Sequence, residues 1–356
     1  MLSHDRKNNF GVLRLLFANL VVYYHSYFLI DGNAHRDIFY RVSGAMPVGT
    51  LAVAGFFLIS GYLVVKSYTN SVSVKDYLVK RLLRIWPGYA VAFLISVLVV
   101  APLGGAKLAD INVLNNVTCF LTFQAPCVDG VVFHGLSQEK VNGSMWTISY
   151  EMRCYVLVIL LGACGFLHDR RKFLALTACL GVAVFLPLNI KLPFYRVFGS
   201  LSADVLLIGL FCAGGVFYLY RDRIRFRVGY AVIALPIWLA LQFSVATAQI
   251  ALMTAGAYIL FYVATRKGDN FIGRFTENTD LSYGIYLYSY PIQQLILWRD
   301  RDIGTYKLLG ISLVGAWALG ALSWYVVERP ALRLKPRSVP RKLAPAAALV
   351  GADERN

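Results

Sequence analysis

The chain has 356 residues, of which 58% are hydrophobic and only 15% are charged, and its formal net charge is +16. Soluble globular domains are typically about 45–50% apolar and about 25% charged, so these values exclude an ordinary soluble domain, and a disordered chain is excluded as well. Six cysteines are too few for a secreted disulfide scaffold of this length. The composition therefore indicates a chain embedded in a membrane.

Long uncharged runs follow one another along the chain, and about 20 apolar residues are enough for a helix to cross a bilayer. The run over 228–265 is long enough for two crossings, with a hairpin predicted at Gln242–Gln249. We therefore predict an all-α polytopic membrane protein with about ten transmembrane helices in one domain, residues 1–335, followed by a disordered tail, residues 336–356. The runs are, in chain order, Leu15–Ile30, Val42–Val65, Ile85–Ala106, Cys154–Leu167, Phe173–Ile190, Val205–Tyr220, Val228–Thr265, Leu281–Trp298 and Leu308–Val327.

Lysine and arginine residues are distributed unevenly between the two sides of this predicted bundle. If the N-terminus is cytoplasmic, the cytoplasmic segments hold 24 of these residues and the opposite loops hold nine. Cytoplasmic loops of membrane proteins carry such an excess, so both termini are predicted to be cytoplasmic. The positive charge is thereby explained by topology and by contact with anionic membrane lipid, and nucleic acid is not expected as a partner.

One predicted external loop is long, and it holds Cys119 and Cys127, the two cysteines outside the predicted helices. The sequence leaves open whether they form a disulfide or remain free thiols, because a bridge requires an oxidising compartment. The histidines and the other cysteines are scattered without the spacing of a metal site, so no metal is expected.

The first predicted helix carries two ionisable residues, Arg14 and His25, which are eleven positions apart. This spacing places them on one face of a helix, about 16 Å apart along its axis. An ionisable group inside a bilayer is costly unless it faces a cavity or a partner. The pair therefore either lines a polar path through the bundle, or consists of an arginine that snorkels to the headgroups and a histidine that is hydrogen-bonded inside the bundle.

Glu151 lies about 9 Å inside the external boundary of its predicted helix, close to the depth expected for His25. A carboxylate and an imidazole at one depth can form a general base with its orienting group. The alternative is a structural ion pair of Glu151 with Arg153 or Arg196.

Arg81 and Arg84 lie in the loop before the third predicted helix, Lys80–Pro87, at the cytoplasmic membrane surface. They are three positions apart and share one helical face, and two such guanidinium groups can clamp a phosphate. The alternative is that they only anchor the helix at the membrane surface, as basic residues commonly do.

These motifs together resemble the membrane-bound acyltransferase 3 family, whose members O-acylate sugars and other hydroxyl acceptors at the bacterial inner membrane. The resemblance covers almost the whole chain, and it rests on six short motifs that occur in order. They are Arg14 with His25, Phe56-Phe57-x-x-Ser60-Gly61-Tyr62, Arg81-x-x-Arg84 with Trp86-Pro87, Trp146-Thr147-x-Ser149-x-Glu151, Tyr283-Gly284-Ile285-Tyr286-Leu287, and Glu328-x-Pro330.

The resemblance implies a multi-pass protein of the bacterial inner membrane that uses cytoplasmic acyl-CoA, usually acetyl-CoA, as its donor. The acceptor expected from it is a carbohydrate or glycolipid on the extracytoplasmic side. The family's essential arginine and histidine fall on Arg14 and His25. One departure is that many members have a histidine at the position of Ser289.

We therefore predict an integral membrane O-acyltransferase, with His25, Arg14 and Glu151 as the catalytic residues and Arg14, Arg81 and Arg84 binding acetyl-CoA. Acetyl or another short acyl group such as succinyl, and direct transfer or an acyl-histidine intermediate, remain open at this stage. The alternative function is a transporter or flippase of a glycan or lipid-linked intermediate, and a membrane sensor or scaffold comes third. Transport is less favoured because the sequence has no internal repeat with paired broken helices, which transporters often show.

Overall fold

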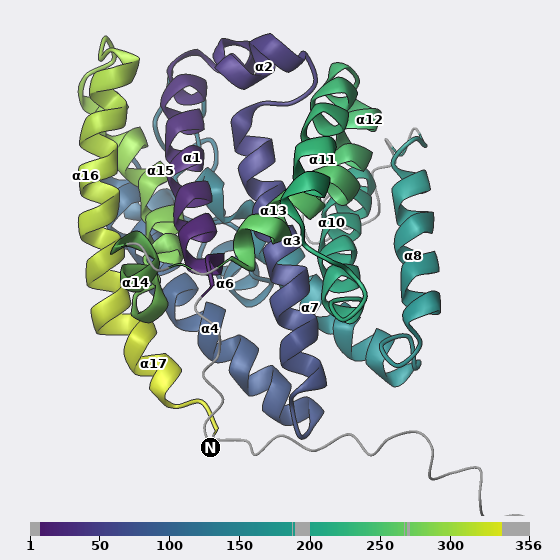
Figure 1. Ribbon diagram of the computed structural model, residues 1–356. Coiled ribbons are helices and arrows are strands. Elements are labelled where there is room, and N and C mark those ends of the chain that lie inside the picture. The colour runs from purple at the N-terminus through teal and green to yellow at the C-terminus, as the bar shows by residue number, and fades with distance from the viewer. Residues whose placement is uncertain (1–7, 187, 189–199, 267, 269–270, 337–356) are drawn as a thin grey trace, which may run out of the picture.

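The computed structural model describes residues 8–186, 188, 200–266, 268 and 271–336, and these residues form a bundle of helices (Figure 1). Their bounds are α1 Phe10–Asp31, α2 Ile38–Ser43, α3 Val48–Thr69, α4 Val74–Ile95, α5 Ala101–Leu103, α6 Val113–Leu121, α7 Trp146–Ala163, α8 Arg170–Ala183, α10 Leu201–Leu219, α11 Val228–Ala240, α12 Val245–Ala251, α13 Ala257–Ala264, α14 Phe271–Asn278, α15 Ser282–Arg299, α16 Thr305–Ser323 and α17 Arg329–Arg333.

Seven helical segments among the described residues are long and apolar enough to cross a membrane, and each overlaps a predicted run. They are Phe10–Asp31, Val48–Thr69, Val74–Leu103, Gly143–Ala163, Leu201–Leu219, Val245–Ala264 and Thr305–Arg333. The protein is therefore a polytopic all-α membrane protein.

The other three predicted crossings are also helical, in α8, α11 and α15. Within the described residues α8 and α11 have 14 and 13 residues, which is short for a crossing. Helix α15 has 18 residues but carries serine, tyrosine and glutamine side chains along its length. The total of ten crossings and the cytoplasmic position of both termini stay predictions, and most of the predicted tail, 337–356, lies outside the described residues.

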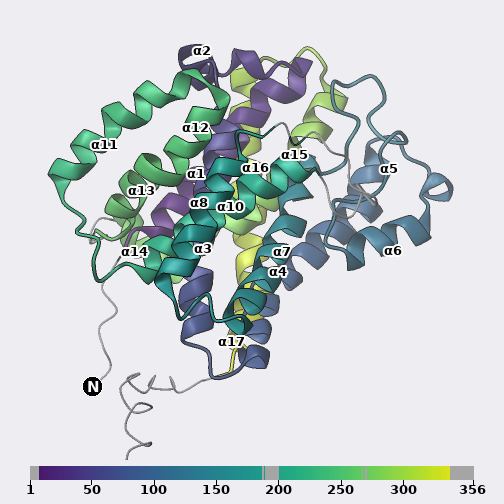
Figure 2. The same cartoon turned by 90° about the vertical axis from the view of Figure 1, so that its right-hand side faces the viewer.

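Helix α1 lies between several other helices of the bundle. It packs against α3, α15 and α16, and α3 packs in turn against α10. Helix α4 contacts α15 and α3, and α7 contacts α3. Figure 2 shows α11, α12 and α13 on one flank of the bundle and α5 and α6 on the other. The side chains of α1, α3, α4, α7 and α15 therefore meet in the interior.

The crossing of α3 and α10 is close because glycines occupy the contact. A Cβ added at Gly61 of α3 would lie 1.8 Å from the carbonyl oxygen of Phe211, and one added at Gly214 of α10 would lie 2.0 Å from that of Leu58. Small residues allow this approach of two backbones, which is how membrane helices gain packing energy without a hydrophobic driving force between them. The contact fixes α3, which carries several residues of the interior cavities.

Gly61→Ala is expected to lower the stability of the protein by about 1–3 kcal/mol, because the added methyl forces the two backbones apart. The fraction of protein that stays folded on heating in detergent measures this loss. Gly310→Ala in α16 is the matched control, since its added Cβ has no neighbour within 4 Å. Equal thermal stability of the two variants would contradict the close α3–α10 contact.

Helix α4 begins earlier than the sequence indicated. Its first turn starts at Val74, where the hydroxyl of Ser73 accepts the amide hydrogen of Asp76 at 3.1 Å and caps the helix. The segment Lys80–Pro87 is therefore helical, and the prediction of a loop there was wrong. The cause is that hydropathy marks only the apolar part of a helix, whereas the cap marks its true start.

Cys119 and Cys127 are joined by a disulfide, which decides between the two alternatives left by the sequence. The side chain of Asn116, one turn before Cys119 on α6, donates to the carbonyl of Cys127 at 3.1 Å and accepts from its amide at 3.0 Å. The disulfide and these hydrogen bonds hold the first part of the loop between α6 and α7, up to Cys127, against α6.

Candidate active site

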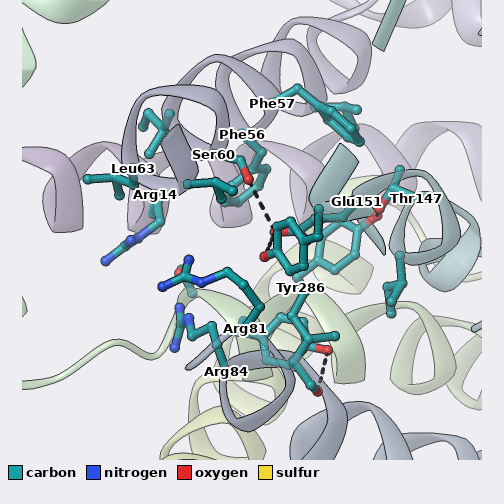
Figure 3. Close-up of a pocket in the computed structure, with 18 residues that line it drawn as sticks. Arg14, Phe56, Phe57, Ser60, Leu63, Arg81, Arg84, Thr147, Glu151 and Tyr286 are labelled. Atoms are coloured by element: carbon teal, nitrogen blue, oxygen red, sulfur yellow. Dashed lines mark hydrogen bonds between the residues drawn. The ribbon is translucent and has the colours of Figure 1, made fainter. Parts of the chain in front are cut away.

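Four of the five predicted site residues line one interior cavity of about 120 Å³ between α1, α3, α4, α7 and α15. Arg14, Arg81 and Arg84 lie on one side of it, and their guanidinium groups converge (Figure 3). Glu151 lies on the other side, near Tyr286. We call this space the basic cavity.

A carboxylate that the sequence reasoning missed, Asp280, organises the arginines of the basic cavity. It lies just before α15, and its Oδ2 is 3.0 Å from Nη2 of Arg14 and forms a second ion pair with Arg84. The hydroxyl of Ser282 donates to its other oxygen at 2.5 Å. Burial disfavours the charge of this carboxylate, but the two arginines outweigh burial and lower the pKa of Asp280 below the usual range. Asp280 therefore holds Arg14 and Arg84 side by side.

Arg81 differs from its two neighbours because it makes no ion pair among the described residues. Its Nε is buried without a hydrogen-bond partner there, and its guanidinium carbon lies 5.9 Å from the ring centre of Tyr155. The surroundings of Arg81 are positive as well. Burial and the repulsion of four nearby cations lower the pKa of Lys335, which follows α17, to about 8. These cations are Arg81, Arg84, Lys80 and Arg14. This end of the cavity is thus suited to bind an anion.

Glu151 has hydroxyl partners in the basic cavity. Ser60 of α3 donates to its Oε1 at 3.3 Å, and Tyr155 donates to the same oxygen at 2.6 Å (Figure 3). Arg153, which the sequence offered as an ion-pair partner, pairs with Asp204 of α10 instead. The other offered partner, Arg196, lies outside the described residues.

His25 lines a second cavity of about 350 Å³, near the other end of α1. Its ring packs edge-on against Tyr290 of α15, with ring centres 5.1 Å apart. Its Nδ1 is buried and has no hydrogen-bond partner among the described residues. Lys140 and Trp146 also line this space, which we call the His25 cavity. The structure therefore places Arg14 and His25 in different cavities, in keeping with their expected separation along the helix.

The expected contact of Glu151 with His25 is not among the contacts of the described residues, since the two side chains line different cavities. The two cavities are neighbours that share part of their lining, because Val53 of α3 and Tyr286 of α15 line both. Ser289, where the resemblance leads to the expectation of a histidine, is fully buried, and its hydroxyl has no partner among the described residues. It lines neither cavity.

The sequence held a weak signal for Asp280 and Tyr286. Asp280 is the last acidic residue before the hydroxyl-rich segment that opens α15. Tyr286 is part of a motif used for the resemblance, yet nothing in its spacing distinguishes a wall between two cavities from ordinary packing.

Asp280→Asn is expected to lower stability by about 3 kcal/mol, because it leaves the half-buried guanidinium group of Arg14 without its ion-pair partner and Arg84 with only Glu328, 3.9 Å away. The thermal unfolding midpoint in detergent measures this loss. Asp222→Asn is the control, because Asp222 forms an exposed pair with Arg170 and such pairs contribute little. Equal midpoints of the two variants would contradict the role of Asp280.

Comparison with known proteins assigns the class of this helical membrane protein. Residues 8–327 match a family described as an acyltransferase domain. Since the match spans most of the chain, the protein is a membrane acyltransferase. It belongs to the acyltransferase 3 family, which confirms the resemblance in its motifs.

Two relatives match the chain over nearly its full length. It is 29% identical over 362 residues to an O-acetyl transferase of Shigella phage Sf6, a match that covers 94% of this chain and 98% of that protein. It is also 29% identical over 379 residues to Nodulation protein 10 of Rhizobium leguminosarum bv. viciae, covering 96% of this chain and 98% of that protein. No solved structure matches the chain.

Proposed function

We propose that the protein transfers an acetyl group from acetyl-CoA to a hydroxyl of a carbohydrate or glycolipid acceptor. The donor binds from the cytoplasm and the acceptor from the other side of the bacterial inner membrane. The choice of an acetyl group is supported by the phage relative, which is named an O-acetyl transferase.

The observation that carries the proposal is the pair of cavities along α1. The basic cavity, with Arg14, and the His25 cavity lie near opposite ends of this one helix and share a wall. The excess of lysine and arginine in the predicted cytoplasmic segments supports a cytoplasmic position for the end with the basic cavity.

On the donor side, Arg81 binds a phosphate group of acetyl-CoA, because it is the arginine of the basic cavity without an ion pair among the described residues. Arg14 and Arg84, held in place by Asp280, complete the positive surface. Planar guanidinium groups suit this task because each can donate two parallel hydrogen bonds to phosphate oxygens.

On the acceptor side, His25 acts as the general base. Its imidazole takes the proton from the acceptor hydroxyl while that oxygen forms the new ester bond to the acetyl carbon. The bond from this carbon to the sulfur of coenzyme A breaks, and the thiolate leaves and is protonated. Glu151 acts from the donor side, where it holds the hydroxyls of Ser60 and Tyr155 toward the cavity. Positioning of the two substrates supplies much of the remaining acceleration.

Mass spectrometry of the surface glycan from cells with and without the gene tests this function. The proposal predicts that the glycan persists on the deleted cells and loses acetyl esters, which return when the gene is restored. Loss of the whole glycan from the surface would contradict it and favour the transporter alternative.

A further inference from the structure

Two side chains are common to the linings of the cavity that takes the donor and the cavity that holds His25. Val53 of α3 and Tyr286 of α15 line both spaces, whereas the arginines line only the first and His25 only the second. On the proposed function, the acetyl group, still bonded to the sulfur of coenzyme A, must therefore extend from the basic cavity between Val53 and Tyr286, where the acceptor hydroxyl attacks it from the side of His25.

Tyr286 is held in its place by contacts on both its hydroxyl and its ring. The hydroxyl donates to the carbonyl of Ser144 and accepts from the hydroxyl of Thr147 at 2.7 Å. The ring is buried and packs edge-on against Phe56, with ring centres 6.0 Å apart. A ring fixed at both ends cannot readily turn aside to make room for a larger group.

Val53 is the other residue that lines both cavities, and its side chain has little conformational freedom. It lies on α3, where a β-branched side chain has essentially one allowed rotamer. The helix itself is fixed by the glycine contact of Gly61 with α10. The width of the passage is therefore set by the size of one side chain, and the loss of two methyl groups widens it.

We propose that Val53 and Tyr286 form the passage for the acyl group and that they determine its length, so that acetyl passes and longer acyl groups are rejected. This inference rests on the proposed function and adds the residues that select the donor. One additional methylene group in an apolar space changes discrimination by about 10–200-fold. The native protein should therefore prefer acetyl-CoA over propionyl-CoA by a factor in that range.

The test is a competition between equimolar acetyl-CoA and propionyl-CoA in open membrane fragments that carry the full chain and its natural glycan. Mass spectrometry counts acetyl and propionyl esters on the glycan, and their ratio reports the ratio of kcat/KM without any correction for protein amount. Val53→Ala is expected to raise the propionyl-to-acetyl ratio about tenfold or more. Val53→Ile is expected to lower it.

Val65→Ala is the matched control, because it makes the same chemical change on the same helix at a buried residue that lines neither cavity. Its ester ratio should equal that of the native protein. A native ratio in Val53→Ala, an equal rise in Val65→Ala, or a raised or unchanged ratio in Val53→Ile would overturn the passage. If Val53→Ala does not accumulate, the Val53→Ile arm decides alone. Absence of any ester made by the native protein would instead refute the proposed function.

Discussion

His25→Ala is expected to abolish acyl transfer while the protein still binds coenzyme A. Loss of a general base typically costs 10²–10⁴-fold in rate. The donor should remain bound, because His25 lines the cavity away from Arg14, Arg81 and Arg84. Transfer from radiolabelled acetyl-CoA and binding of coenzyme A are measured on the same protein in nanodiscs. The rate should also fall as the medium is acidified, because a protonated imidazole cannot accept the acceptor's proton.

Two variants separate catalysis by His25 from a merely structural role. His25→Gln keeps the approximate volume and hydrogen bonding of the side chain but cannot exchange a proton, so it should lose as much activity as His25→Ala. His35→Ala is the control, because His35 is exposed and lines neither cavity. Near-native turnover by His25→Gln would refute the general base, and loss of coenzyme A binding in His25→Ala would place the donor in the His25 cavity.

Arg81→Ala is expected to weaken the binding of coenzyme A by about 10–100-fold. A hydrogen bond to a charged group contributes about 1.5–3 kcal/mol, which corresponds to this range. Arg81 is the best probe of the donor site, because its removal leaves no partner carboxylate uncompensated among the described residues. Arg84 lacks this advantage, since it forms an ion pair with Asp280 and lies 3.9 Å from Glu328.

The controls for Arg81 distinguish a specific contact from general attraction to a positive surface. Lys75→Ala removes a cation from the same helix at an exposed position outside both cavities, and it should leave the affinity near the native value. Arg81→Lys should recover only part of the affinity, because an ammonium group cannot reproduce the two parallel hydrogen bonds of a guanidinium group. Full recovery of the affinity by Arg81→Lys, or an equal loss of affinity in Lys75→Ala, would contradict a specific phosphate contact and favour membrane anchoring as the role of Arg81.

Much of the helical architecture follows from the hydropathy of the chain, because each apolar run must satisfy its own backbone hydrogen bonds within the bilayer. The ends of the helices were less predictable. Helix α4 starts before its apolar part because Ser73 caps it, and a hydropathy run does not register a cap. The break between α11 and α12 lies at Leu241–Ser244, partly within the predicted hairpin.

The candidate site was predictable in its parts but not in its grouping. Arg81 and Arg84 share a helical face, and their spacing alone indicates that. The meeting of Arg14 with Asp280 depends on how α1 packs against α15, which no local pattern specifies. The same limit explains why Glu151 was expected beside His25. The equal depth that was expected for the two residues was wrong, because Glu151 lines the cavity at the Arg14 end of α1, where it packs with Ser60 and Tyr155.

The most direct test of the central claim is transfer across the membrane. Right-side-out vesicles from producing cells receive radiolabelled acetyl-CoA either inside or outside, and label is then measured on the glycan that an external glycosidase releases. The account predicts labelling from the internal donor, none from the external donor, and none in vesicles with His25→Ala. Labelling from external acetyl-CoA at the same rate, or native labelling by His25→Ala, would contradict it.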